Sequence, residues 1–223
     1  MESNGGTVPT TMLHPLCVLT SALATPQEAA RQASELFEAG VLWVQYRSKI
    51  GSDADRFKEL RELSSRLPAG AILTINDRAD LAALLRIGSV HLGDRDLPAI
   101  PARQILGETV QIGVSTHSPQ EASAASEGPV DYVALGPIYS SSSKATSRIP
   151  LGLGALGSAR KGVIGKHLVA IGGIREDHLE GVFRTRADAV AVISAVWDSP
   201  RPIEAAKRMF DAAFRCRNES VET

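Results

Sequence analysis

Two short apolar runs in this chain end in acidic residues. Asp77 closes the run 71–77, and Asp94 and Asp96 follow the run 89–93. Carboxylate oxygens suit Mg²⁺, which usually takes one or two of them and completes its shell with water and substrate phosphate. Zinc is not indicated, because the five histidines show no ligand spacing with cysteine or with each other. The residues alone leave two alternatives open, namely helix capping and pairing with Arg95.

A basic group follows another apolar run. In the stretch QYRSK, the two-residue period of a strand places Gln45, Arg47 and Lys49 on one side, and Tyr46 and Ser48 on the other. Two cations and an amide would then converge on one spot, which is typical of an anion site. A solvated strand end with ordinary surface charges is the alternative.

Three further segments have the composition of phosphate sites. Four consecutive hydroxyls, at 140–143, precede Lys144, so that serine donors and a point charge could bind an anion. Gly172 and Gly173 would let backbone N–H groups approach a ligand, and Ile193 and Ser194 follow the last apolar run. A polar linker and a tight turn are the respective alternatives.

These residues would be positioned by a repeated strand-then-helix pattern. Eight strands are predicted, each followed by a helical segment, at 16–20, 42–47, 71–77, 89–93, 111–116, 131–136, 167–173 and 189–195. Prolines at 26, 119 and 202 suit first helical turns, and the sixth helix is expected near 153–161. Eight units predict a single-domain (β/α)₈ TIM barrel, whose active-site face is formed by the loops after the strands.

An open doubly wound sheet is the structural alternative to the barrel. Its only support is the stretch GLGALG at 152–157, which formally matches a dinucleotide fingerprint. That stretch follows a polar run with a proline and not a strand, so a flexible loop entering a helix is the preferred interpretation.

Composition narrows the class of protein. The chain has 223 residues, 43% of them hydrophobic, with 24 Lys+Arg against 25 Asp+Glu, so no global field would attract nucleic acid or an anionic membrane surface. Small-molecule chemistry is expected. Two distant cysteines suit a reducing cytoplasm, and neither a signal peptide nor a membrane span is recognised. We expect tails at 1–12 and 217–223 around a barrel domain at 13–216; a homo-oligomer is compatible with the sequence.

From about Leu16 to Phe214 the chain resembles the thiamine phosphate synthase family. VQYRSK is similar to the family's VQLREK, INDRADLA to INDR(V/A)DLA, and SVHLGDRDLP to GVHLGQEDLP, while IGVSTHSPQEA, DYVALGPIYSSSSK and ADAVAVISA follow in the family's order. The resemblance implies that Asp77 and Asp96 hold Mg²⁺. It implies pyrophosphate contacts for Gln45, Arg47, Lys49, Asn76 and Lys144, a place beside the pyrimidine ring for Ser115, and thiazole-phosphate and loop contacts for Ser141, Ser143, Gly173, Ile193 and Ser194.

The implied reaction couples 4-amino-2-methyl-5-(hydroxymethyl)pyrimidine diphosphate with a thiazole phosphate, giving thiamine phosphate and pyrophosphate. Arg47, Lys49, Lys144 and Mg²⁺ would stabilise the departing pyrophosphate, and a pyrimidine-methylene cation would be captured by the thiazole nitrogen. Two alternatives remain: a thiazole tautomerase, in which His117 would act as acid or base, and a non-catalytic barrel that binds thiazole phosphate.

Departures from the family's pattern concern the first strand and the serine segment. Cys17 and Ser21 stand where the family favours tyrosine and aspartate, and four serines replace its Pro-Thr-x-Thr stretch. Loop closure and turnover rate are the properties that we expect these departures to affect.

Overall fold

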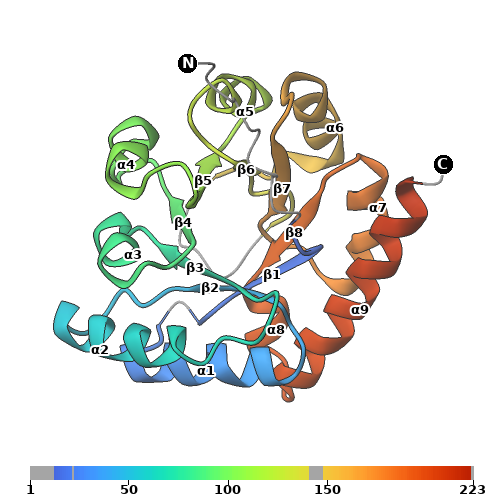
Figure 1. Cartoon of the computed structure of the whole chain (residues 1–223). Helices are drawn as coiled ribbons and strands as arrows, with labels where there is room; N and C mark the ends of the chain where they lie inside the picture. The colour runs from blue at the N-terminus through green and yellow to red at the C-terminus, as the bar shows by residue number, and fades with distance from the viewer. Residues whose placement is uncertain (1–12, 22, 141–147, 222–223) are drawn as a thin grey trace.

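Eight parallel strands close into a barrel in which each strand pairs with its neighbours in sequence and β1 pairs with β8 (Figure 1). The computed structural model describes residues 13–21, 23–140 and 148–221. The strands are β1 (Leu16–Leu19), β2 (Trp43–Tyr46), β3 (Ile72–Asn76), β4 (Ser89–Leu92), β5 (Gln111–Thr116), β6 (Tyr132–Leu135), β7 (His167–Ile171) and β8 (Ala189–Val192). The predicted TIM barrel is confirmed, and the doubly wound sheet is wrong.

Helices surround the barrel (Figure 1). They are α1 (Pro26–Glu38), α2 (Asp53–Ser64), α3 (Ala79–Leu85), α4 (Ala99–Leu106), α5 (Pro119–Ser126), α6 (Gly152–Gly162), the short 3-10 helix η1 (Glu176–His178), α7 (Leu179–Arg184), α8 (Ser194–Trp197) and α9 (Pro202–Val221). Within the described ranges, none of these helices is long and apolar enough to cross a membrane.

Local sequence signals explain where several helices begin. Thr25 caps α1 by accepting from the Glu28 N–H at 3.3 Å, and the Glu28 carboxylate accepts from the Thr25 N–H at 2.8 Å. Ser118 caps α5 in the same position relative to Pro119. The GLGALG stretch lies inside α6, in agreement with its rejection as a dinucleotide motif.

The termini differ from the predicted boundaries in one respect. The last helix, α9, continues to Val221, so most of the segment predicted as a C-terminal tail over 217–223 is helical. The predicted N-terminal tail, 1–12, lies outside the described residues.

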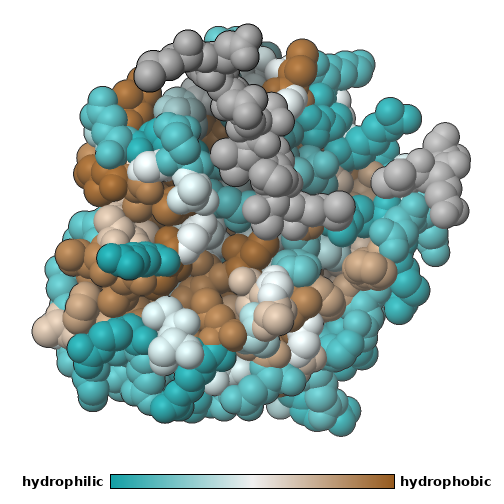
Figure 2. Space-filling model, in the orientation of Figure 1, coloured by the Kyte–Doolittle hydropathy of each residue, from teal (hydrophilic) through white to brown (hydrophobic). Residues whose placement is uncertain are grey.

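Apolar residues form two layers. The larger cluster lies between the strands and the surrounding helices, and a smaller one fills the barrel, where Cys17, Trp43 and Tyr132 are buried. Such burial on both sides of each strand is typical of parallel sheets. On the outside, Figure 2 shows brown patches over the side of α3 and α4, where Leu84, Ile100 and Ile105 are exposed.

Candidate active site

The end of β2 presents the predicted amide, Gln45, and one predicted cation, Arg47, to the inside of the barrel, whereas Lys49 is exposed. Gln45 is 4% exposed and Arg47 is 8% exposed, on the same side of the strand as Trp43. Tyr46 packs on the opposite side in the outer core, where its hydroxyl donates to the Pro26 carbonyl at 3.3 Å. The predicted alternation along β2 is therefore confirmed.

Thr20 fixes the backbone of Arg47. Its hydroxyl, fully buried, donates to the Arg47 carbonyl and accepts from the Arg47 N–H, both at 2.8 Å. One side chain after β1 thus replaces the ladder hydrogen bonds where β2 ends. Sequence reasoning missed Thr20, because a threonine beside a strand end carries no signal for its partner across the sheet.

The Arg47 guanidinium is a buried cation with spare hydrogen-bonding capacity. Its Nη1 is buried and has no hydrogen-bond partner among the residues that the structure describes. Burial lowers the pKa of Arg47, and the charge of Asp77 opposes that shift. Arginine stays protonated in proteins, so this site holds a positive charge that an incoming anion would neutralise.

Asp77 occupies a backbone conformation that is uncommon for a residue with a side chain. Its φ is 68°, and its N–H donates to the His91 carbonyl at 2.8 Å. Such strain is concentrated at functional sites. The side chain lies 3.6 Å from Lys49 Nζ. Because α3 begins after Arg78 with no side-chain cap, the helix-capping alternative for Asp77 is wrong.

Asp96 brings a second carboxyl group to Asp77. Its Oδ2 accepts from the Gly93 N–H at 2.7 Å, and α4 begins after Pro98 without a side-chain cap, so Asp96 does not cap that helix either. Burial raises the pKa of Asp77, and the hydrogen bond and charge of Asp96 raise it further against the charges of Lys49 and Arg47. Two carboxyl groups this close share a proton or a cation.

The acidic pair fits magnesium better than a protein-only metal cage. In the described part of the chain, no group of three or more His, Cys, Asp and Glu side chains is arranged to hold a metal ion. Mg²⁺ commonly uses only one or two carboxylates together with substrate phosphate and water, so Asp77 and Asp96 supply a donor set of the right kind and number.

Asp94 does not join the acidic pair. Its carboxylate pairs with Arg148 at 2.9 Å and lies 3.6 Å from His117 Nδ1, in place of the alternative pairing with Arg95. The His117 N–H donates to Glu121 at 2.8 Å, just before α5. These contacts favour a structural role for His117 at the start of that helix.

Asn76 and Ser115 also face the interior. Asn76 is the register partner of His91 on β4, and the Ser115 hydroxyl on β5 lies 2.9 Å from His91 Nε2. Sequence reasoning missed His91 as well as Tyr132, which lies 3.1 Å from His91 Nδ1. The partners of His91 lie on β5 and β6, and nothing in the sequence of β4 indicates them.

The loops after β6 and β7 are joined backbone to backbone. The Tyr139 N–H donates to the Gly172 carbonyl at 2.9 Å. A Cβ atom at Gly173, where φ is 65°, would lie 2.2 Å from the Ser140 carbonyl oxygen. Gly173 is therefore required by this close approach. After β8, Ile193 and Ser194 lead directly into α8. Three predicted residues, Ser141, Ser143 and Lys144, lie outside the described residues.

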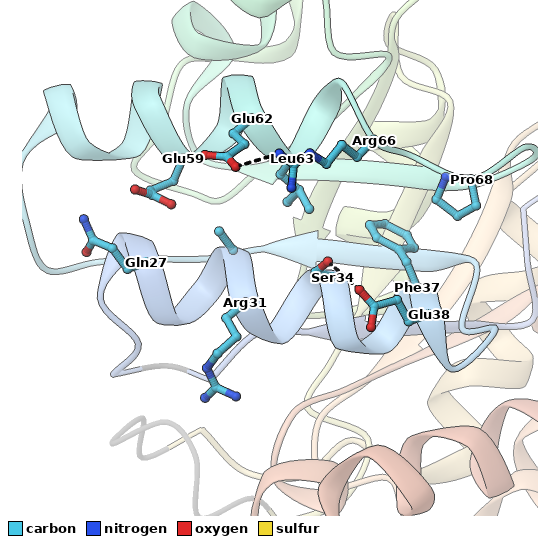
Figure 3. A pocket seen from close by; sticks show the side chains of 11 residues that line it. Gln27, Arg31, Ser34, Phe37, Glu38, Glu59, Glu62, Leu63, Arg66 and Pro68 are labelled. Atoms are coloured by element: carbon cyan, nitrogen blue, oxygen red, sulfur yellow. Dashed lines mark hydrogen bonds and ion pairs between the residues drawn. The ribbon is translucent and has the colours of Figure 1, made fainter.

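A groove of about 440 Å³ lies elsewhere, on the outer side of the barrel between α1 and α2 (Figure 3). Figure 3 shows Arg31 and Glu38 on one wall and Glu62, paired with Arg66, on the other. None of the predicted site residues that the structure describes lines it. The residues that could carry out chemistry lie at the strand ends and not in this groove.

Comparison with known proteins agrees with that geometry. Residues 16–196 match the family described as thiamine monophosphate synthase. The chain belongs to this family. A thiamine-phosphate synthase of Koribacter versatilis is 41% identical over 76% of the chain and 80% of its own length. One from Anaeromyxobacter dehalogenans is 39% identical over 82% of each.

A solved structure extends the likeness to three dimensions. The thiamine phosphate pyrophosphorylase of Pyrococcus furiosus superimposes with a TM-score of 0.78 at 28% identity, covering 92% of this chain and 98% of that one. A 3-hexulose-6-phosphate synthase, with a TM-score of 0.64 at 16% identity, shares the fold alone. The chain is thus an enzyme of the thiamine-phosphate synthase type, a transferase of thiamine biosynthesis.

Proposed function

We propose that the site couples 4-amino-2-methyl-5-(hydroxymethyl)pyrimidine diphosphate with a thiazole phosphate in a magnesium-dependent reaction. The observation that carries this proposal is the buried Arg47 guanidinium, whose Nη1 has no hydrogen-bond partner in the described residues and which lies beside the Asp77 and Asp96 pair. A pyrophosphate that carries a metal ion matches this arrangement, because the anion suits the Arg47 cation and the metal suits the two carboxylates.

In this proposal Asp77 and Asp96 hold Mg²⁺, which supplies electrostatic stabilisation to the departing pyrophosphate. Arg47 and Lys49, whose charges act on Asp77, bind the pyrophosphate oxygens. Thr20 holds both backbone groups of Arg47, and burial of the side chain restricts the guanidinium, so little reorganisation of this residue accompanies the reaction. Gln45 and Asn76 complete the polar wall, and Lys144 acts from the serine segment.

The bond to pyrophosphate breaks as the aminopyrimidine supports a methylene cation, and the thiazole nitrogen then captures that cation. Ser115 lies beside the pyrimidine ring. Ser141, Ser143, Gly173, Ile193 and Ser194 hold the thiazole phosphate. No general base is needed for these two steps, which agrees with the structural contacts of His117.

The decisive experiment mixes both substrates with Mg²⁺ and follows thiamine phosphate and pyrophosphate together. Equimolar appearance of both products supports the proposal. Isomerised thiazole phosphate without coupling would instead assign a tautomerase, and binding without turnover would assign a regulatory barrel. A cytoplasmic location, supported by two free cysteines, and a homo-oligomeric state remain predictions.

A further inference from the structure

A chain of buried polar side chains crosses the barrel beneath the proposed site. The Tyr132 hydroxyl lies 3.1 Å from His91 Nδ1, and His91 Nε2 lies 2.9 Å from the Ser115 hydroxyl. His91 is 7% exposed, whereas Ser115 is only partly buried. The imidazole therefore links the barrel interior to a hydroxyl that borders the site.

Tyr132 is a firm anchor for this chain. Its ring meets Trp43 edge to face at 5.6 Å between centroids. It also fills the space beside Gly113, where a Cβ atom would lie 1.9 Å from the Tyr132 Cζ. Burial raises the pKa of Tyr132 well above its ordinary value, so the phenol keeps its proton. The polar side chains of Thr74 and Gln45 oppose part of that rise.

Hydrogen bonding at the two ring nitrogens of His91 is coupled. When the phenol donates to Nδ1, the neutral ring carries its proton on Nε2 and donates to the Ser115 oxygen, which leaves the serine hydrogen for a ligand. In the other tautomer Nε2 accepts from Ser115 and leaves the oxygen lone pairs for a ligand. In both cases His91 occupies one hydrogen-bonding function of Ser115 and directs the other.

We propose that His91, held by Tyr132, is a positioning residue that orients the Ser115 hydroxyl for recognition of the aminopyrimidine ring. This inference rests on the proposed function, because Ser115 is assigned there to the ring. His91 acts through Ser115, in the way that outer partners orient the groups that touch a substrate.

Three substitutions separate the two ends of the imidazole. Asparagine keeps a polar atom near the position of Nδ1, glutamine keeps one near Nε2, and leucine keeps neither. We expect His91→Asn and His91→Leu to raise the KM for pyrimidine diphosphate about five- to tenfold, the factor of one lost hydrogen bond. His91→Gln should be closer to wild type. The KM for thiazole phosphate and inhibition by pyrophosphate should not change.

A double-mutant cycle with Ser115→Ala tests whether His91 acts through the serine. If it does, His91→Asn should add less than about twofold to the KM of the Ser115→Ala variant, because coupled residues are not additive. Full additivity, or an equal rise in the KM values of both substrates, would overturn the inference. Tyr132→Phe should shift the pyrimidine KM in the same direction as His91→Asn.

Thr116→Val provides a matched control. Thr116 is buried on β5 next to Ser115, and its hydroxyl donates to the Ala134 carbonyl at 3.1 Å. Its loss should lower the melting temperature without changing the pyrimidine KM. If Thr116→Val changed that KM as much as the His91 variants do, loss of any buried polar group would produce the effect. Such a result would contradict a specific role for His91.

Calorimetric titration with pyrimidine diphosphate keeps the two proposals distinguishable. If wild type binds the pyrimidine diphosphate but makes no thiamine phosphate, the proposed coupling reaction is wrong. Weaker binding by His91→Asn, with near-normal binding by His91→Gln, would still support the positioning role. If wild type does not bind the pyrimidine, both proposals fail. Normal turnover in wild type with normal binding by every His91 variant would overturn the positioning role alone.

Discussion

Arg47 is positively charged in a place where burial opposes that charge. We expect Arg47→Met, which keeps the length of the side chain, to lower kcat/KM by about 100-fold or more, because one preorganised donor to a developing charge commonly contributes that much. Steady-state kinetics with varied pyrimidine diphosphate would measure the effect. Arg66→Met is the matched control, since Arg66 is exposed in the outer groove and pairs with Glu62. Equal kinetics for the two variants would contradict the anion site.

Substitutions in the acidic pair, Asp77 and Asp96, should weaken magnesium-dependent activity but stabilise the metal-free protein. We expect Asp77→Asn and Asp96→Asn each to raise the Mg²⁺ concentration for half-maximal activity about tenfold or more, since each removes a charge from a divalent cation. If both bind one ion, the double variant should lose less than the product of the single losses. If activity depends on Mg²⁺ concentration in the variants as it does in wild type, Asp77 and Asp96 do not bind the metal.

Without metal, the same substitution should stabilise the fold. The pKa of Asp77 is raised, so its favourable contribution is present at low pH and is lost as pH rises through the folded-state pKa. At pH 7 the ionised pair therefore destabilises the metal-free protein, and Asp77→Asn should melt at a higher temperature than wild type in the presence of a chelator. At pH 4 this difference should shrink. A lower melting temperature at both pH values would indicate a structural role for the carboxylate.

At the scale of elements, an arginine and an aspartate recur in two neighbouring parts of the barrel. Before β6, the Asp131 carboxylate accepts from the Ile112 N–H of β5 and pairs with Arg103 of α4, each at 2.7 Å. Before β8, Asp188 accepts from the Leu168 N–H of β7 at 2.7 Å and pairs with Arg160 of α6 at 2.8 Å. Each aspartate thus ties a helix to two strands, at the end of the barrel opposite the site.

The second of these contacts predicts a pH dependence of stability. Burial raises the pKa of Asp188, but the nearby His167 imidazole, the hydrogen bond from the Leu168 N–H and the charge of Arg160 lower it to a net value below the usual range. A lowered pKa gives stability above the unfolded-state pKa of about 3.9, which is lost as pH falls through the folded value. Asp188→Asn should therefore melt below wild type at pH 7, with the difference closing below about pH 4.

Asp211→Asn is the control for that measurement. Asp211 pairs with Lys207 on the exposed side of α9, where an ion pair contributes little. Thermal melts of both variants across pH should show a deficit for Asp188→Asn alone. A deficit that persists unchanged into acid would mean that the carboxylate charge of Asp188 is not what joins α6 to β7 and β8.

At the scale of the whole molecule, sequence reasoning succeeded where one strand or one strand end carried the information. The count of eight units predicted the closed barrel, and the period of two placed Gln45 and Arg47 on one side of β2. Sequence reasoning failed where a contact depends on how neighbouring strands are aligned with each other. The contacts of Thr20 with Arg47, and of His91 with Ser115, join residues 27 and 24 positions apart and depend on closure of the barrel.

The ends of the strands were also hard to predict from the sequence alone. The last strand was expected to reach residue 195 but ends at Val192, because α8 begins two residues later. An apolar run has the same composition whether its end is a strand or the first turn of a short helix. Only packing against the rest of the barrel distinguishes the two.

The whole molecule should also report occupancy of the site through its melting temperature. A ligand that binds only the folded state at 100 times its Kd stabilises by about 2.7 kcal/mol. That stabilisation corresponds to roughly 5–10 °C for a domain of this size. We expect Mg²⁺ with pyrophosphate to produce such a shift, and either one alone to produce less, because the carboxylate pair would bind the metal and Arg47 the anion of the same complex. The Asp77→Asn, Asp96→Asn double variant should lose the additional shift that Mg²⁺ gives with pyrophosphate while keeping part of the shift from pyrophosphate alone, since Arg47 and Lys49 remain. If the double variant responds to the mixture as wild type does, the two carboxylates do not bind the metal. If pyrophosphate shifts neither protein, the anion site is elsewhere.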